Sequence, residues 1–169
     1  EPILSHNIAR IEKEPEKLVE SLKIVMDMVN ADRGIIGIKN VHKEAIEDLK
    51  RVIDDPRITI HGLQNIYPMG EERALVRESL GILLEPEKLP LAANAVVINC
   101  ETLYRLRDAV IDKKPLMDKD MTVAGKLKEN GSIHVFLDIP LGTPVSAVIE
   151  KAGGIGDEYG ELIMGGPFT

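Results

Sequence analysis

The sequence predicts an α/β protein in which a mainly parallel sheet with crossover helices is followed by a small unit of two strands, a helix and a further strand. Two observations support this prediction. Between residues 15 and 113, short apolar runs of strand character alternate with amphipathic stretches of helical length, as in parallel strands joined by helices. Beyond Lys114 and Pro115, two short strand-like runs flank Asn130 and Gly131, a dipeptide that favours a hairpin turn.

The first elements follow from hydrophobic periodicity. A helix is expected over about residues 15 to 30, because Pro15 suits a first helical position and apolar residues recur behind it at helical spacing. Residues 34–38 and 58–60 are apolar runs of strand length. The apolar stripe over residues 45–53 predicts a helix between these two strands.

Two later segments each join an apolar, strand-like run to a turn residue and then to a helix start. They are residues 66–75, with Gly70 at the turn, and residues 95–103, with Asn99 at the turn. The helix of the first segment is expected to end at Gly81, and prolines mark a loop before the second. Because α/β proteins present backbone amides and polar side chains to ligands at such places, the pair predicts a cofactor site.

The last part predicts a small separate module. Strands are expected over residues 121–127 and 133–137, followed by a helix that Thr143 caps and that two glycines, at 153 and 154, end. A final strand is expected at residues 162–164, and the four elements together resemble a β-grasp. The predicted division is an α/β core over residues 1–116, a β-grasp module over 117–156, and a terminal strand and turn over 157–169.

Composition limits the classes of function. The net charge of −7 argues against nucleic-acid binding, and a single cysteine in 169 residues excludes an internal disulfide or a four-cysteine metal site within this chain. The four histidines lack metal-ligand spacing, so no metal site is predicted. No apolar run approaches the ~20 residues of a membrane helix and no signal peptide opens the chain, which favours a cytoplasmic protein. The missing start methionine suggests a piece of a longer protein.

Several of these residues carry a family resemblance. The run from Tyr67 to Leu75 resembles the glycine–glutamate segment shared by the NADH-binding flavoprotein of respiratory complex I and by the RnfC protein of the Rnf electron transport complex. The run from Ile98 to Leu103 is similar to an asparagine–glutamate–threonine–leucine segment of the former, and residues 89–90, 96–97 and 164–167 are similar to the latter. The last module resembles the soluble-ligand-binding β-grasp (SLBB) module of both. Rnf-like proteins associated with proline reductase look closest.

The resemblance implies electron transfer from NADH through FMN to iron–sulfur clusters that lie outside this chain. The partners it implies are other redox subunits or a reductase, in a cytoplasmic protein that can associate with a membrane complex without entering the bilayer. Gly70 would let the backbone approach the cofactor, Glu71 and Glu72 would face the nicotinamide and flavin, and Asn99 and Thr102 would lie near the FMN phosphate or ribityl chain. No catalytic residue is implied, and the cofactor-binding residues are Tyr67, Gly70, Glu71, Glu72, Asn99 and Thr102.

The chain also departs from the family pattern. The glycine-rich loop that cradles the FMN phosphate is absent from these residues, so the chain alone is expected to bind FMN weakly or not at all and to be inactive. Cys100 takes the place of a second asparagine. Glu71 and Glu72 also suit a plain helix start, and Asn99 a plain helix cap. Two functions therefore stay open: part of an Rnf-like redox protein, whose final acceptor could equally be that of related cobalamin-reducing flavoproteins, or a non-catalytic domain that binds a partner or ligand.

Overall fold

The computed structural model describes residues 3–129, 131–157 and 160–166. The chain forms two compact units. Ile11 to Pro115 make up the first, here called the α/β unit, and the chain up to Arg10 together with the chain from Leu116 makes up the second, the hairpin unit. The boundary falls inside helix α1 (His6–Lys13). Within the described ranges no helix combines the length and the hydropathy that a membrane crossing requires.

The α/β unit is built on a parallel pair of strands. Strand β1 (Gly34–Lys39) lies beside β2 (Ile58–Leu63), in a register that runs from Gly34 opposite Ile58 to Lys39 opposite Leu63. Helix α3 (Lys43–Val52) makes the crossover between them. The α/β class, the two strands and the helix between them are as predicted, and the described residues place two strands in this sheet.

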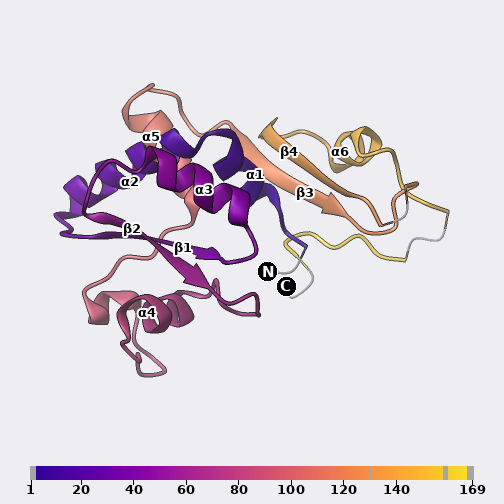
Figure 1. Cartoon of the computed structure of the whole chain (residues 1–169). Coiled ribbons are helices and arrows are strands. Elements are labelled where there is room, and N and C mark those ends of the chain that lie inside the picture. The colour runs from indigo at the N-terminus through magenta and orange to yellow at the C-terminus, as the bar shows by residue number, and fades with distance from the viewer. Residues whose placement is uncertain (1–2, 130, 158–159, 167–169) are drawn as a thin grey trace. The chain divides into compact units, whose positions relative to one another are not determined.

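Helices cover both faces of this sheet (Figure 1). Helix α2 (Pro15–Val29) packs on α3 and on α5 (Cys100–Val110), whereas α4 (Glu72–Leu80) contacts β1 from the other face. The glycines of β1 show the alternation: a Cβ on Gly34 would lie 2.7 Å from the sulfur of Met26 in α2, and one on Gly37 would lie 2.9 Å from a methyl carbon of Leu75 in α4. Glycine thus lets a helix approach the strand closely on each side.

The predicted helix boundaries agree with the observed caps. Helix α2 begins at Pro15 and is followed by Asn30 in the left-handed conformation, and α4 is followed by Gly81 with φ of 71°. The apolar core lies between α2, α3, α5 and the sheet, where Leu18, Ala45 and Leu49 are at most 1% exposed. The predicted strand before α5 is wrong, because residues 95–98 join no sheet and follow a short 3-10 helix (Pro90–Ala93) in an extended conformation.

The hairpin unit contains the predicted antiparallel hairpin. Strand β3 (Asp118–Ala124) pairs with β4 (Ile133–Pro140), and helix α6 (Val145–Lys151) follows, ended by Gly153 and Gly154 in left-handed conformations. A single bridge between Leu127 and Ile155 adds to the pairing. Asn130 of the predicted turn lies outside the described residues.

Two predictions in this unit are wrong. Thr143 does not cap α6: its hydroxyl donates back to the carbonyl of Pro140 at 2.7 Å, and Pro144 occupies the cap position. The described residues 160–166 contain no strand, so the strand expected at residues 162–164 is absent, and all three of those apolar side chains are exposed. The rest of the predicted terminal segment, at 158–159 and 167–169, lies outside the described residues.

Candidate functional site

The loop that precedes α4 displays the first group of predicted site residues. Met69 is 6% exposed and anchors the loop in the core of the α/β unit, while Tyr67, 53% exposed, faces solvent. The backbone N–H of Glu71 donates to the carbonyl of Pro68 at 2.8 Å, which closes a turn directly before the helix. Glu71 and Glu72 are therefore held at the helix start with their side chains exposed.

The two glutamates occupy the positive end of α4. Glu71 is the cap residue, and its Oε2 accepts from the backbone N–H of Ala74 at 2.9 Å. Glu72 lies in the first turn. The helix-start interpretation of Glu71 is thus confirmed, and it leaves room for a second role, because an exposed carboxylate has more acceptor sites than this one bond uses.

Gly70 is not required by the chain's own geometry. Its φ is outside the left-handed region, and a Cβ built there would meet nothing within 4 Å. A side chain would therefore fit without strain as far as the described residues are concerned. The bare backbone at this exposed turn offers space for a group that belongs to another molecule.

A neighbouring arginine fixes α4 against the loop that follows it. Arg73 donates through Nη1 to the carbonyl of Pro86 at 2.8 Å and through Nη2 to that of Leu84 at 2.9 Å. Leu84 is 6% exposed, so the loop is also anchored by its apolar side chain. No sequence pattern predicted this bracing. It leaves Arg73 directed at carbonyls of its own chain rather than at an anion.

The start of α5 carries the second group. Asn99 is the cap residue, and its Oδ1 accepts from the backbone N–H of Glu101 at 2.9 Å. Asn99 and Thr102 are exposed, Cys100 is half-buried and Glu101 is buried. The helix-cap interpretation of Asn99 is confirmed. A neutral cap and an exposed hydroxyl make this the less acidic of the two helix starts at the surface.

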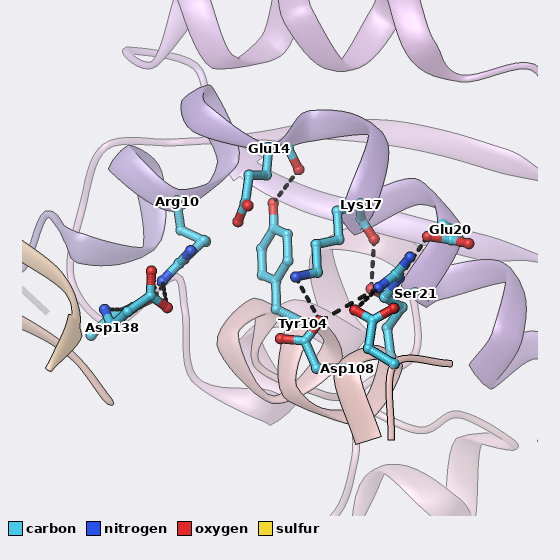
Figure 2. Close-up of polar contacts among 11 residues, drawn as sticks. Arg10, Glu14, Lys17, Glu20, Ser21, Tyr104, Asp108 and Asp138 are labelled. Atoms are coloured by element: carbon cyan, nitrogen blue, oxygen red, sulfur yellow. Dashed lines mark hydrogen bonds and ion pairs between the residues drawn. The ribbon is translucent and has the colours of Figure 1, made fainter. Parts of the chain in front are cut away.

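Polar contacts between α2 and α5 hold the second group in place (Figure 2). The buried Tyr104 donates its hydroxyl proton to the carbonyl of Glu14 at 2.9 Å, and the ammonium of Lys17 lies 2.6 Å from Oδ1 of Asp108. Arg107 donates from Nε to Glu20 at 2.7 Å, and this hydrogen bond is the main reason that its pKa is raised. The spacing of Tyr104 and Asp108, one helical turn apart, was the available sequence signal.

The six predicted residues fall into two groups rather than one. Tyr67, Gly70, Glu71 and Glu72 lie together at the start of α4. Asn99 and Thr102 lie at the start of α5, which packs on α2 and so lies on the other side of the sheet from α4 (Figure 1). In the part of the chain that the structure describes, no group of three or more His, Cys, Asp or Glu side chains could hold a metal ion.

The chemistry of each group fits a different part of a flavin or nicotinamide cofactor. Two carboxylates at a helix start accept hydrogen bonds from hydroxyl and N–H groups, and they repel phosphate from the one end of the helix that would otherwise attract it. The α4 group therefore fits ribose hydroxyls or ring N–H groups. The α5 group, with neutral Asn99 and Thr102, fits a ribityl hydroxyl or a phosphate oxygen.

Comparison with known proteins agrees with this chemistry. Residues 1–108 match the family model described as the Nuo51 FMN-binding domain. The RnfC-type component of a Na⁺-translocating ferredoxin:NAD⁺ oxidoreductase complex from Acetobacterium woodii is 32% identical over 168 residues, which cover 99% of this chain and 37% of the relative. The corresponding component of a proton-translocating complex of the same kind from Clostridium ljungdahlii is 30% identical over 168 residues, 99% of this chain and 36% of the relative.

A third relative has a different printed activity. The cobalamin reductase PduS of Citrobacter freundii is 28% identical over 167 residues, 99% of this chain and 36% of the relative. The chain thus spans little more than a third of the length of these relatives. The RnfC-like resemblance predicted from the sequence is confirmed. The closer relation to proline reductase stays a prediction.

Proposed function

The chain belongs to the Nuo51 FMN-binding domain family, and from this premise we propose that it is part of an electron-transfer flavoprotein that passes electrons from NADH through FMN to iron–sulfur clusters. FMN accepts a hydride and releases electrons singly, which is the chemistry such a protein needs from its cofactor. Because the chain spans about 37% of its relatives, this activity belongs to the whole protein.

The names of the relatives support the proposal. Two of them are subunits of ferredoxin:NAD⁺ oxidoreductase complexes, which pairs a nicotinamide nucleotide with a one-electron carrier. Other redox subunits are therefore the proposed partners, in a cytoplasmic protein that associates with a membrane complex. The clusters would be held outside this chain, which has a single cysteine.

The observation that carries the proposal is the exposed pair Glu71 and Glu72 behind the open turn at Gly70. In the proposed site the backbone at Gly70 allows a planar ring to approach, and the two carboxylates accept hydrogen bonds from it or from a ribose. Tyr67 lies exposed on the same loop, where its ring can cover one side of the ligand. These residues orient a cofactor and leave the redox step to it.

The second group would act at the other end of the flavin. Asn99 and Thr102 are proposed to contact the ribityl chain or the phosphate at the start of α5. Their position is set by the contacts of α5 with α2, above all the buried Tyr104. A phosphate would need further backbone amides, because Asn99 already binds one amide of this helix start itself.

The test uses the full-length flavin-loaded protein with Glu71→Gln and Glu72→Gln. Glutamine keeps an oxygen that can cap Ala74, so the melting temperature should stay within about 2 °C of the parent, as for ordinary surface changes. Loss of a hydrogen bond to a bound polar group should slow flavin reduction by NADH by roughly 10- to 100-fold, measured by stopped-flow absorbance of the flavin.

The matched control is Glu44→Gln. Glu44 is an exposed glutamate in the first turn of α3, so it undergoes the same loss of charge at a helix start that has no proposed ligand. Flavin reduction should be unchanged in this variant. Parent rates in all three variants would remove Glu71 and Glu72 from the site.

A second candidate function rests on the caps themselves. Glu71 and Asn99 each bind an amide of their own helix, which gives both residues a sufficient structural role without any ligand. The chain would then be a non-catalytic scaffold that binds a partner protein or a soluble ligand through the β-grasp module. Flavin that loads at full stoichiometry in the full-length protein, yet ignores Glu71→Gln and Glu72→Gln, is the outcome that would favour this alternative.

The final electron acceptor is a finer part of the proposal. We propose a reductase partner of the proline-reductase type, on the residue-level resemblance alone. Cobalamin is the competing acceptor, since the relative PduS is named a cobalamin reductase. Steady-state NADH oxidation by the full-length protein, with each acceptor supplied in turn, would separate the two.

A further inference from the structure

The beginning of the chain is tied to strand β3 within the hairpin unit. Residues 5–10 are here called the N-terminal strap. The backbone N–H groups of Ser5 and His6 both donate to Oγ1 of Thr122 at 3.0 Å, and Nδ1 of His6 lies 3.0 Å from the same hydroxyl. The first N–H groups of a helix lack partners within it, so Thr122 caps α1 from a distant strand.

The other end of the strap is held by a buried ion cluster. Arg10 is 3% exposed and binds Asp120, itself 2% exposed, in a two-point contact: Nε to Oδ2 at 2.8 Å and Nη2 to Oδ1 at 2.5 Å. Nη2 also donates to Oδ1 of Asp138 at 2.6 Å (Figure 2). Such paired guanidinium–carboxylate contacts are among the strongest and most directional hydrogen bonds in proteins.

The hairpin is shaped to receive Arg10. The register of β3 and β4 shifts between Lys119 and Met121, which is a β-bulge, and Asp138 in the facing strand has φ of 62°. Bulges re-aim side chains. Here the irregular backbone lets the N–H of Asp138 donate to Oδ1 of Asp120 at 2.9 Å, so both carboxylates meet the same guanidinium.

We propose that the N-terminal strap is an integral part of the hairpin unit and that its binding through Arg10 is what keeps the β3–β4 hairpin in its folded form. Without Arg10, the carboxylate of Asp120, whose side chain is 1% exposed, would remain buried without its bidentate partner. A buried charge stripped of its partner strongly destabilises a fold. The module predicted from residue 117 onward would therefore lack a necessary segment, which the chain supplies from about 110 residues earlier.

The test is amide hydrogen exchange on the full chain carrying Arg10→Met. The amides of Ser5, His6 and Asp138 should exchange roughly 10- to 100-fold faster, the factor that corresponds to losing a hydrogen bond to a charged group. Amides of α3, in the other unit, should be unchanged. The matched control is Arg51→Met, which removes an exposed arginine that pairs with Asp48. It should leave all of these amides at parent rates.

Two milder variants serve if Arg10→Met does not fold. Arg10→Lys keeps the charge but loses the two-point contact, and Thr122→Val removes the hydroxyl that caps α1 while keeping the side-chain shape. Both should accelerate exchange of Ser5 and His6, and Arg10→Lys should also accelerate Asp138. Parent exchange rates at Ser5, His6 and Asp138 in the Arg10 variants would overturn the proposal, whatever the flavin chemistry of the full-length protein.

Discussion

Replacement of Tyr104 by phenylalanine removes one hydroxyl from the contact between α5 and α2. Tyr104 is 1% exposed, and its hydroxyl lies 2.9 Å from the carbonyl oxygen of Glu14. That carbonyl also accepts the first helical hydrogen bond of α2, from Leu18, at the long distance of 3.4 Å. The tyrosine hydroxyl is the closer of these two donors, so Tyr104→Phe weakens the start of α2 as well as its contact with α5.

The expected loss follows from this geometry. Phenylalanine keeps the ring and leaves no cavity, so the free energy of unfolding should fall by the net value of one buried hydrogen bond, about 0.5–1.5 kcal/mol. In a chain of this size a loss of ~1 kcal/mol lowers the melting temperature by about 2–4 °C. Urea unfolding followed by circular dichroism gives the first quantity, and calorimetry gives the second.

The same chemical change at an exposed tyrosine is the control. Tyr67 is 53% exposed, so Tyr67→Phe should alter the free energy of unfolding by no more than ~0.5 kcal/mol. An equal effect of the two substitutions would mean that the hydroxyl of Tyr104 contributes nothing beyond a surface hydroxyl. The idea that this contact sets the position of Asn99 and Thr102 would then fall with it.

Other residues give outcomes that can be measured on the same chain. Leu49→Ala empties a position with 0% exposure and should cost about 2–5 kcal/mol in urea unfolding. The pKa of Asp55 is lowered from 3.8 to about 2, chiefly by the hydrogen bond from the Arg57 side chain, so this carboxylate stabilises the fold fully above pH 3.8 and loses that effect as the pH falls toward 2; an NMR titration should show this, and Asp55→Asn should abolish it. FMN added to the chain alone should bind weakly or not at all in a fluorescence titration, and stoichiometric binding would show that no upstream phosphate loop is needed.

Local signals were enough to predict the helices and the paired strands. Pro15 and Gly81 act at single positions through backbone geometry, so the residues themselves mark where α2 begins and where α4 ends. The same holds for the candidate site, where Glu71 and Asn99 lie at helix starts as the sequence indicated. Their distribution over two sides of the sheet depends on helix packing, which no local pattern records.

The failures also have physical causes. Residues 95–98 have the apolar composition of a strand, but a strand needs a neighbour to bond with, and the described chain offers none there. Thr143 bonds backward to Pro140 instead of forward to the helix, a choice that threonine makes as readily in turns. Arg10 and Asp120 lie 110 positions apart, so their pairing could not be foreseen from spacing.

That separation has a consequence for the order of folding. Strands β1 and β2 meet across a single helix and β3 and β4 across a tight turn, so both pairs close short loops, whereas Arg10 must find partners 110 and 128 positions away. The entropy cost of closing a loop grows with its length, and contacts of high sequence separation form slowly. During synthesis Arg10 also leaves the ribosome long before Asp120 exists. The strap is therefore expected to dock last, onto a hairpin that has waited for it with two carboxylates still in water.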